Sequence, residues 1–192
     1  LKIGISVLSV LVLSFFINQN SKSNAKEAEF GLSIGMVYLE KGDIQNAMMQ
    51  FQQIVDEYSS APSGYSASFY IGKIHFDKSE YDLALSHFER SISRKNNIFL
   101  NNAAYSALAE IHANKNQYDE AISFQKKLID NSSSFLDEAF SMLKLGKFHL
   151  LNGDKEIAKS ILQNILDENP DNQDIKSEAD YLNGLIQTLG VD

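Results

Sequence analysis

The chain has 192 residues, of which 44% are hydrophobic and 22% charged, so it can bury one core and carry a short appendage. Its formal net charge of −8 argues against a nucleic-acid-binding protein, because such proteins need a basic surface that displaces counterions from phosphates. The absence of cysteine excludes disulfide frameworks, thiolate metal sites and thiol nucleophiles.

An uncharged apolar stretch covers residues 3–17 and is followed by polar residues. As a helix it would be about 22 Å long, somewhat shorter than the roughly 30 Å hydrocarbon core of a bilayer. We expect residues 1–18 to form a transmembrane anchor or signal segment, and a cleaved signal peptide or a buried core helix are the alternatives. Residues 19–26 are expected to form a flexible linker.

A repeat of 37 residues organises the rest of the chain. One series of small residues is Gly35, Gly72, Ala109 and Gly146, and a second series is Ala47, Ala84, Ala121 and Ala158. The apolar residues around both series have helical spacing. Because small residues let two helix backbones approach closely, each repeat is predicted to be a pair of packed helices.

A tight turn is predicted between the two helices of each repeat. In the first repeat, Gly42 can end one helix in a left-handed conformation, and Asp43 can cap the next helix. The same junction is expected at the equivalent pairs Ser79-Glu80, Asn116-Gln117 and Gly153-Asp154.

These repeats resemble the tetratricopeptide repeat family. That family has Leu, Gly or Ala and Tyr in the first helix of each pair, followed by Ala, Phe and Ala in the second. The matching residues are Ile34-Gly35, Tyr38, Ala47 and Phe51, then Ile71-Gly72, Ala84 and Phe88, then Leu108-Ala109, Tyr118 and Ala121, and finally Leu145-Gly146, Ala158 and Pro170. The period is 37 residues where 34 is common.

The resemblance implies an all-α fold, a right-handed α-solenoid of four helix hairpins within a repeat domain at residues 27–189. The hairpins are expected at about residues 28–62, 63–98, 99–134 and 135–171. A further amphipathic helix at residues 172–189 would cap the stack, because the last pair would otherwise expose its apolar side.

Three histidines at the 37-residue interval, His75, His112 and His149, replace the usual tyrosine of this family. We interpret them as structural core residues, since packed helices stand about 8–10 Å apart and a shared metal needs ligands near 2 Å. A pH- or metal-responsive sensor that uses these histidines is the alternative. No catalytic arrangement or phosphate-binding loop is visible, so no enzyme activity, cofactor, metal or small-molecule substrate is expected.

In the tetratricopeptide repeat family the first helices line an inner groove that binds peptides or helices. Counting three before, one after and four after each small residue of the first series gives the candidate groove residues. These residues are Leu32, Met36, Leu39, Phe69, Lys73, Phe76, Ser106, Glu110, Ala113, Leu143, Lys147 and Leu150. The groove is predicted to be largely apolar and to bind protein or peptide partners.

One N-terminal helix, a short linker and four repeats resemble the layout of membrane-anchored bacterial tetratricopeptide proteins, such as the ancillary subunit of the Sec translocon. The resemblance implies a single-pass protein of the bacterial inner membrane with a periplasmic repeat domain. It would serve as a scaffold for protein translocation or periplasmic folding. The alternative is a cleaved, soluble periplasmic adaptor in envelope assembly or cell-wall coordination.

Overall fold

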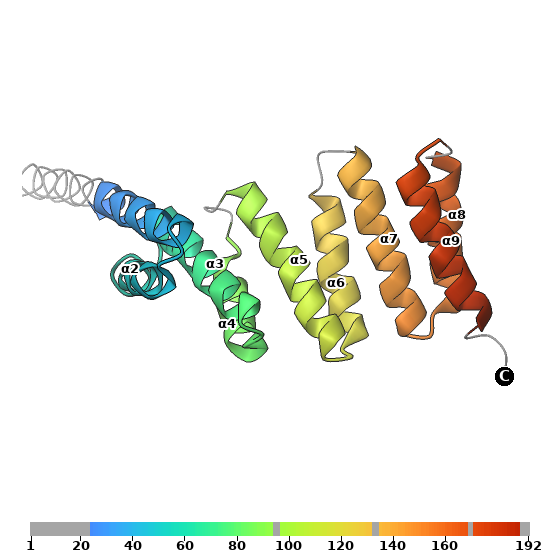
Figure 1. The fold of residues 1–192 in the computed structure, drawn as a ribbon, viewed down its shortest axis with the longest axis horizontal. Helices are drawn as coiled ribbons and strands as arrows, with labels where there is room; N and C mark the ends of the chain where they lie inside the picture. The colour runs from blue at the N-terminus through green and yellow to red at the C-terminus, as the bar shows by residue number, and fades with distance from the viewer. Residues whose placement is uncertain (1–23, 94–96, 132–134, 169–170, 189–192) are drawn as a thin grey trace, which may run out of the picture. The chain divides into compact units, whose positions relative to one another are not determined.

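The computed structural model describes residues 24–93, 97–131, 135–168 and 171–188, and the regular elements in these ranges are all α-helices (Figure 1). The all-α fold class is therefore confirmed for this part of the chain. The first helix covers residues 24–40. It is followed by α2 (Ile44–Glu57), α3 (Pro62–Asp77), α4 (Tyr81–Ser91), α5 (Ile98–Asn114), α6 (Tyr118–Asp130), α7 (Phe135–Leu151), α8 (Lys155–Glu168) and α9 (Gln173–Thr188).

The N-terminal predictions have two different outcomes. Residues 24–26 are helical, so the expected linker does not include them. They extend the first helix because Ala25, Lys26 and Glu27 are all compatible with a helical backbone. The predicted segment at residues 1–18 lies outside the described residues. Among the helices that the structure describes, none combines the length and apolar character needed to cross a membrane.

The four turns lie at the positions that the 37-residue interval predicted. At each turn, the residue two positions before the second helix has a positive φ. These residues are Gly42 (75°), Ser79 (61°), Asn116 (57°) and Gly153 (91°). At each turn a backbone N–H bonds the carbonyl five residues earlier, as from Asp43 to Tyr38 at 2.9 Å. Glycine adopts this left-handed conformation without strain, and asparagine tolerates it better than most residues.

The chain forms two compact units that divide between Leu100 and Asn101, within α5. In the first unit, α2 packs on α3 and α3 packs on α4 (Figure 1). The core under the first helix, α2 and α3 contains Phe51, Ile54, Ile71 and Ile74, all buried. Phe88 of α4 is also buried and contacts the Phe69 ring.

In the second unit, α6 packs on α7 and α7 packs on α8. Its core joins Ala109 of α5 to Ile122 of α6 and to Phe148 of α7. Gln125 of α6 is fully buried where other repeats carry Phe or Leu, and its Nε2 donates to the Ser141 carbonyl at 2.9 Å. This hydrogen bond lets a polar side chain occupy a core position of the repeat.

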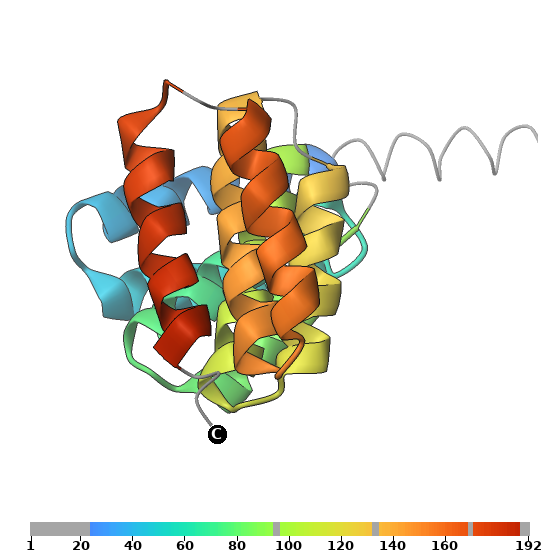
Figure 2. The ribbon, with the colours of Figure 1, turned by 90° about the vertical axis from the view of Figure 1, so that its right-hand side faces the viewer.

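The last helix, α9, packs against α7 and α8, as Figure 2 shows. Its buried residues Ile175, Ala179 and Leu182 join Leu162 and Ile165 of α8 in one apolar cluster. Their spacing of four and three residues places them on one face of the helix. The helix therefore covers the apolar side of the last pair.

Candidate functional site

The three in-register histidines hold the turns between paired helices. His75 Nδ1 lies 2.6 Å from a carboxylate oxygen of Glu80, and His149 Nδ1 lies 3.0 Å from a carboxylate oxygen of Asp154. His112 Nδ1 makes the equivalent contact with the Gln117 side-chain oxygen at 2.9 Å. Each acceptor comes directly before a second helix, so each histidine ties the end of one helix to the start of its partner.

These contacts favour the structural interpretation of the histidines over a shared site. Each ring nitrogen Nδ1 is directed at its own turn, and the three turns belong to successive repeats. Within the described residues, no three His, Asp or Glu side chains come together as a metal-ligand set. Asp154 accepts hydrogen bonds from His149 and Asn152, which lowers the pKa of its carboxyl group.

A fourth histidine, which the repeat pattern did not single out, stacks on the first. The His87 and His75 rings lie 5.7 Å apart with planes 19° from parallel. Burial lowers the pKa of His87, and the nearby His75 and Arg90 lower it further. Protonation of His87 therefore opposes its half-buried position in the folded state.

The residues one position after each small residue of the first series are exposed in both units. Met36, Lys73, Glu110 and Lys147 are all exposed on the first helices of their repeats. They lie about 100° around the helix from the buried small residues of the first series, which is far enough to place them outside the interface between paired helices. These four predicted groove residues are accessible to a partner.

Three predicted groove residues are buried in the structure and belong to its core. Phe69, Leu143 and Leu150 are only 7%, 3% and 4% exposed. The Phe69 ring packs edge-on against Tyr70 and tilted against Phe88. Positions three before and four after a small residue of the first series lie only about 40–60° from it around the helix, so their side chains turn toward the core.

The other five predicted groove residues, Leu32, Leu39, Phe76, Ser106 and Ala113, are half-buried. Leu32 and Leu39 pack against the core of the first unit, and Ala113 packs against that of the second. Phe76 contacts the rings of Tyr81 and Phe88. The exposed members of the predicted groove are thus fewer and more charged than the full set that the sequence predicted.

In the second unit, an aromatic ring and two lysines follow one another along α7. Phe140 is 44% exposed, and Lys144 and Lys147 follow it at steps of four and three residues. Lys144 Nζ lies 3.2 Å from Glu110 Oε2, which bridges α7 to α5. Counting along the sequence missed Phe140 because only three positions around each small residue of the first series were considered. Phe140 lies outside those positions, one turn before Lys144.

In the first unit, a hollow of about 330 Å³ lies between the first helix and the start of α3. Its walls include Glu29 and the predicted groove residue Leu32 from the first helix, and Pro62 and Ser66 from α3. On α3, Lys73 Nζ pairs with Asp77 at 2.9 Å.

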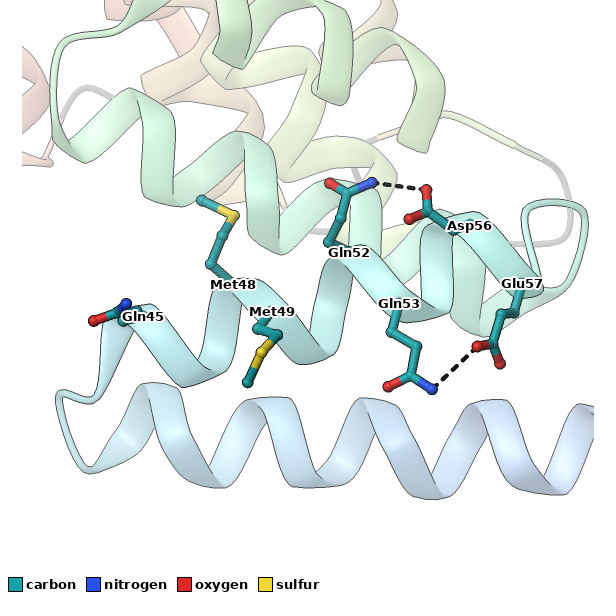
Figure 3. A pocket seen from close by; sticks show the side chains of 7 residues that line it. All are labelled: Gln45, Met48, Met49, Gln52, Gln53, Asp56 and Glu57. Atoms are coloured by element: carbon teal, nitrogen blue, oxygen red, sulfur yellow. Dashed lines mark hydrogen bonds between the residues drawn. The ribbon is translucent and has the colours of Figure 1, made fainter.

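A second hollow, of about 540 Å³, runs along the outer side of α2 and is shown in Figure 3. Met48 and Met49 lie along it, beside Gln52 and Gln53, whose amides donate to Asp56 and Glu57 at 2.8 and 3.1 Å. Met49 is exposed where the equivalent residues of the other repeats are serines. That departure from the repeat pattern was the available signal for this apolar spot.

Stacked helix pairs with small residues at each crossing define an α-helical repeat protein of the tetratricopeptide type. A family model described as "Tetratricopeptide repeat-like domain" matches residues 3–175. The chain therefore belongs to the tetratricopeptide repeat-like family. Such domains bind protein or peptide partners.

Solved structures show the same fold. MamA is 19% identical, with 79% of this chain and 76% of that chain covered, at a TM-score of 0.61. YrrB, described as a protein of this type with an unusual peptide-binding site, is 13% identical over 82% and 76%, at 0.62. A repeat protein from Cytophaga hutchinsonii is 18% identical over 86% and 63%, at 0.66. No protein with curated annotation matches the chain by sequence.

Proposed function

We propose that this protein is a non-enzymatic scaffold that binds protein segments on exposed residues of the first helices of its repeats. The observation that carries the proposal is the surface of α7, where Phe140 stands beside Lys144 and Lys147. An accessible aromatic ring with an exposed lysine two turns further along the helix suits a segment that carries both apolar and acidic side chains. The hollow beside Leu32 offers a second contact region in the first unit.

The scaffold is held at the bacterial inner membrane by residues 1–18, with the repeats on the periplasmic side. Residues 3–17 carry no charge, and an uncharged apolar stretch of this kind supports membrane attachment. The acidic chain is repelled by anionic lipid head groups, which leaves this segment as the attachment. An ancillary role in translocation or periplasmic folding fits this placement.

Membrane attachment is tested by fractionating cells that express the full-length protein. An anchored protein stays in the pellet after an alkaline wash and dissolves only in detergent. Release by the wash, together with a shortened N-terminus, would instead support the cleaved, soluble adaptor. A reporter fused after Asp192 that is active only in the periplasm tests the orientation.

Segment binding is tested by placing a photo-crosslinking amino acid at Lys147 in living cells. The matched control is Gln163, an exposed residue of α8 whose amide donates to Asp167. We expect crosslinks to newly exported proteins from position 147 and few from position 163. Equal capture at both positions would refute a binding surface on the first helices.

A further inference from the structure

The first helix carries a row of exposed residues that no other part of the described structure covers. The row is Lys26, Phe30, Ser33, Val37 and Glu40, which follow one another at steps of four and three residues. Such steps place all five along one line of the helix. Phe30 is 69% exposed and Val37 is 46% exposed, although both are large apolar residues of the kind that repeats usually bury.

The repeat register shows that this face is of a kind that packs against another helix. One repeat later, Phe30 and Val37 correspond to Ala67 and Ile74, which are buried in the same cluster as Phe51 and Ile54 of α2. In the fourth repeat, Phe148 has the equivalent position and is buried against Ile122 of α6. The second and fourth copies therefore use this face to pack on the second helix of the preceding pair.

We infer that the face of the first helix binds the same face of a second copy of this chain, with the two helices antiparallel. The charges at its ends decide the orientation. Lys26 and Glu40 lie about 21 Å apart along the helix, on either side of Ser33. A parallel pair would bring lysine to lysine and glutamate to glutamate, whereas an antiparallel pair brings each lysine to a glutamate.

The apolar residues fit the same symmetry. In the antiparallel arrangement, Phe30 of one copy meets Val37 of the other, and this contact occurs twice. Ser33 lies at the centre, where its small side chain permits close approach, and its Oγ already donates to the Glu29 carbonyl at 3.0 Å. An isologous contact of this kind closes after two copies, so it yields a dimer rather than a chain of subunits.

Membrane anchoring would strengthen a contact of this modest size, and here the inference rests on the proposed function. Two anchored copies share one plane, which raises their effective concentration. A two-fold axis perpendicular to that plane leaves both N-terminal segments on the same side. The apolar residues 3–17 carry no charges with which to pair Lys26 and Glu40, so a second copy suits this face better than the chain's own segment.

Cysteine crosslinking of the full-length protein in isolated membranes tests the dimer, because the natural chain contains no cysteine. We expect Ser33→Cys to form a disulfide-linked dimer on oxidation. The matched control is Ser86→Cys, another exposed serine whose Oγ donates to a carbonyl of its own helix. Absence of a Ser33→Cys dimer, or equal yields from both variants, would overturn the inference.

Charge reversal in the Ser33→Cys background gives the sharper test. Lys26→Glu or Glu40→Lys alone should lower the dimer yield about fivefold, since each places two like-charge pairs in the contact. The double variant should restore the yield, and failure to restore it in a chain of unchanged helicity would count against the antiparallel pair. Crosslinking from Lys147 tests segment binding separately, so loss of either result leaves the other interpretable.

Discussion

The Phe51 ring packs so closely on Gly35 that a Cβ built on the glycine would stand 2.5 Å from its Cε1 atom. The first helix and α2 therefore cross with no space for a side chain at this point. Gly72 is nearly as close to Phe88, at 3.0 Å, whereas Gly146 leaves an ordinary 3.5 Å to its nearest neighbours. Three glycines in the same register thus differ in how much they constrain the packing.

Gly35→Ala should destabilise the protein by about 1–3 kcal/mol, because the added methyl group overpacks the crossing. Gly146→Ala should be neutral or stabilise it by about 0.5–1 kcal/mol, since alanine favours the helix and fits the space. Urea unfolding followed by circular dichroism compares the two variants with the natural protein. Equal effects would show that the glycines serve helix geometry and not close packing.

Acidification should weaken the first unit through His87. Its folded-state pKa is lowered, so the unfolded chain binds more protons than the folded one as the pH falls through the usual histidine range. His87→Phe keeps an aromatic ring beside His75 but cannot be protonated. The variant should lose less thermal stability than the natural protein between about pH 7 and pH 5. Parallel loss in both proteins would assign the effect to other groups.

The His149–Asp154 contact should contribute stability that disappears in acid. The lowered pKa of the Asp154 carboxyl means that its contribution is present above its unfolded-state pKa and is lost as the pH falls through the folded-state value. Asp154→Asn should reduce the melting temperature at neutral pH and remove this part of the acid dependence. Melting curves between about pH 7 and pH 3 measure both effects. An unchanged melting temperature at neutral pH would mean that the turn does not need this carboxylate.

Loss of the exposed ring on α7 should weaken partner binding. Phe140→Ala is expected to lower crosslinking from Lys147 about tenfold, as is typical when an aromatic contact of an interface is truncated. Ile157→Ala on α8 is the control, because Ile157 is 49% exposed and Phe140 is 44% exposed. If both variants reduced the yield equally, general loss of apolar surface would explain the result.

Much of the fold could be predicted from the chain alone, because the same pattern of small and apolar residues occurs in all four repeats. The alanines of the second series mark where paired helices meet, and Ala47, Ala84, Ala121 and Ala158 are all fully buried. The turns at Ser79 and Asn116 carried weak local signals, yet the 37-residue interval placed them correctly.

The accessible surface was harder to predict. Counting along the sequence identifies residues on one side of a helix, but a difference of about 40–60° around the axis separates burial from exposure. That difference buried Phe69 and Leu150 and left Lys73 and Lys147 outside. Phe140 was missed for a different reason, because its position was not among the three that were counted.

Spacing along the chain by itself determined the helices, their pairing and the turns, because these depend on local backbone conformation and on small residues at crossings. Only the tertiary structure decided which side chains remain accessible. Phe30 and Val37 show why: their equivalents Ala67 and Ile74 are buried by α2, whereas the first helix has no earlier described helix to cover them. The exposure of a side chain depends on which other elements pack against it in space, and the sequence of one helix does not contain that information.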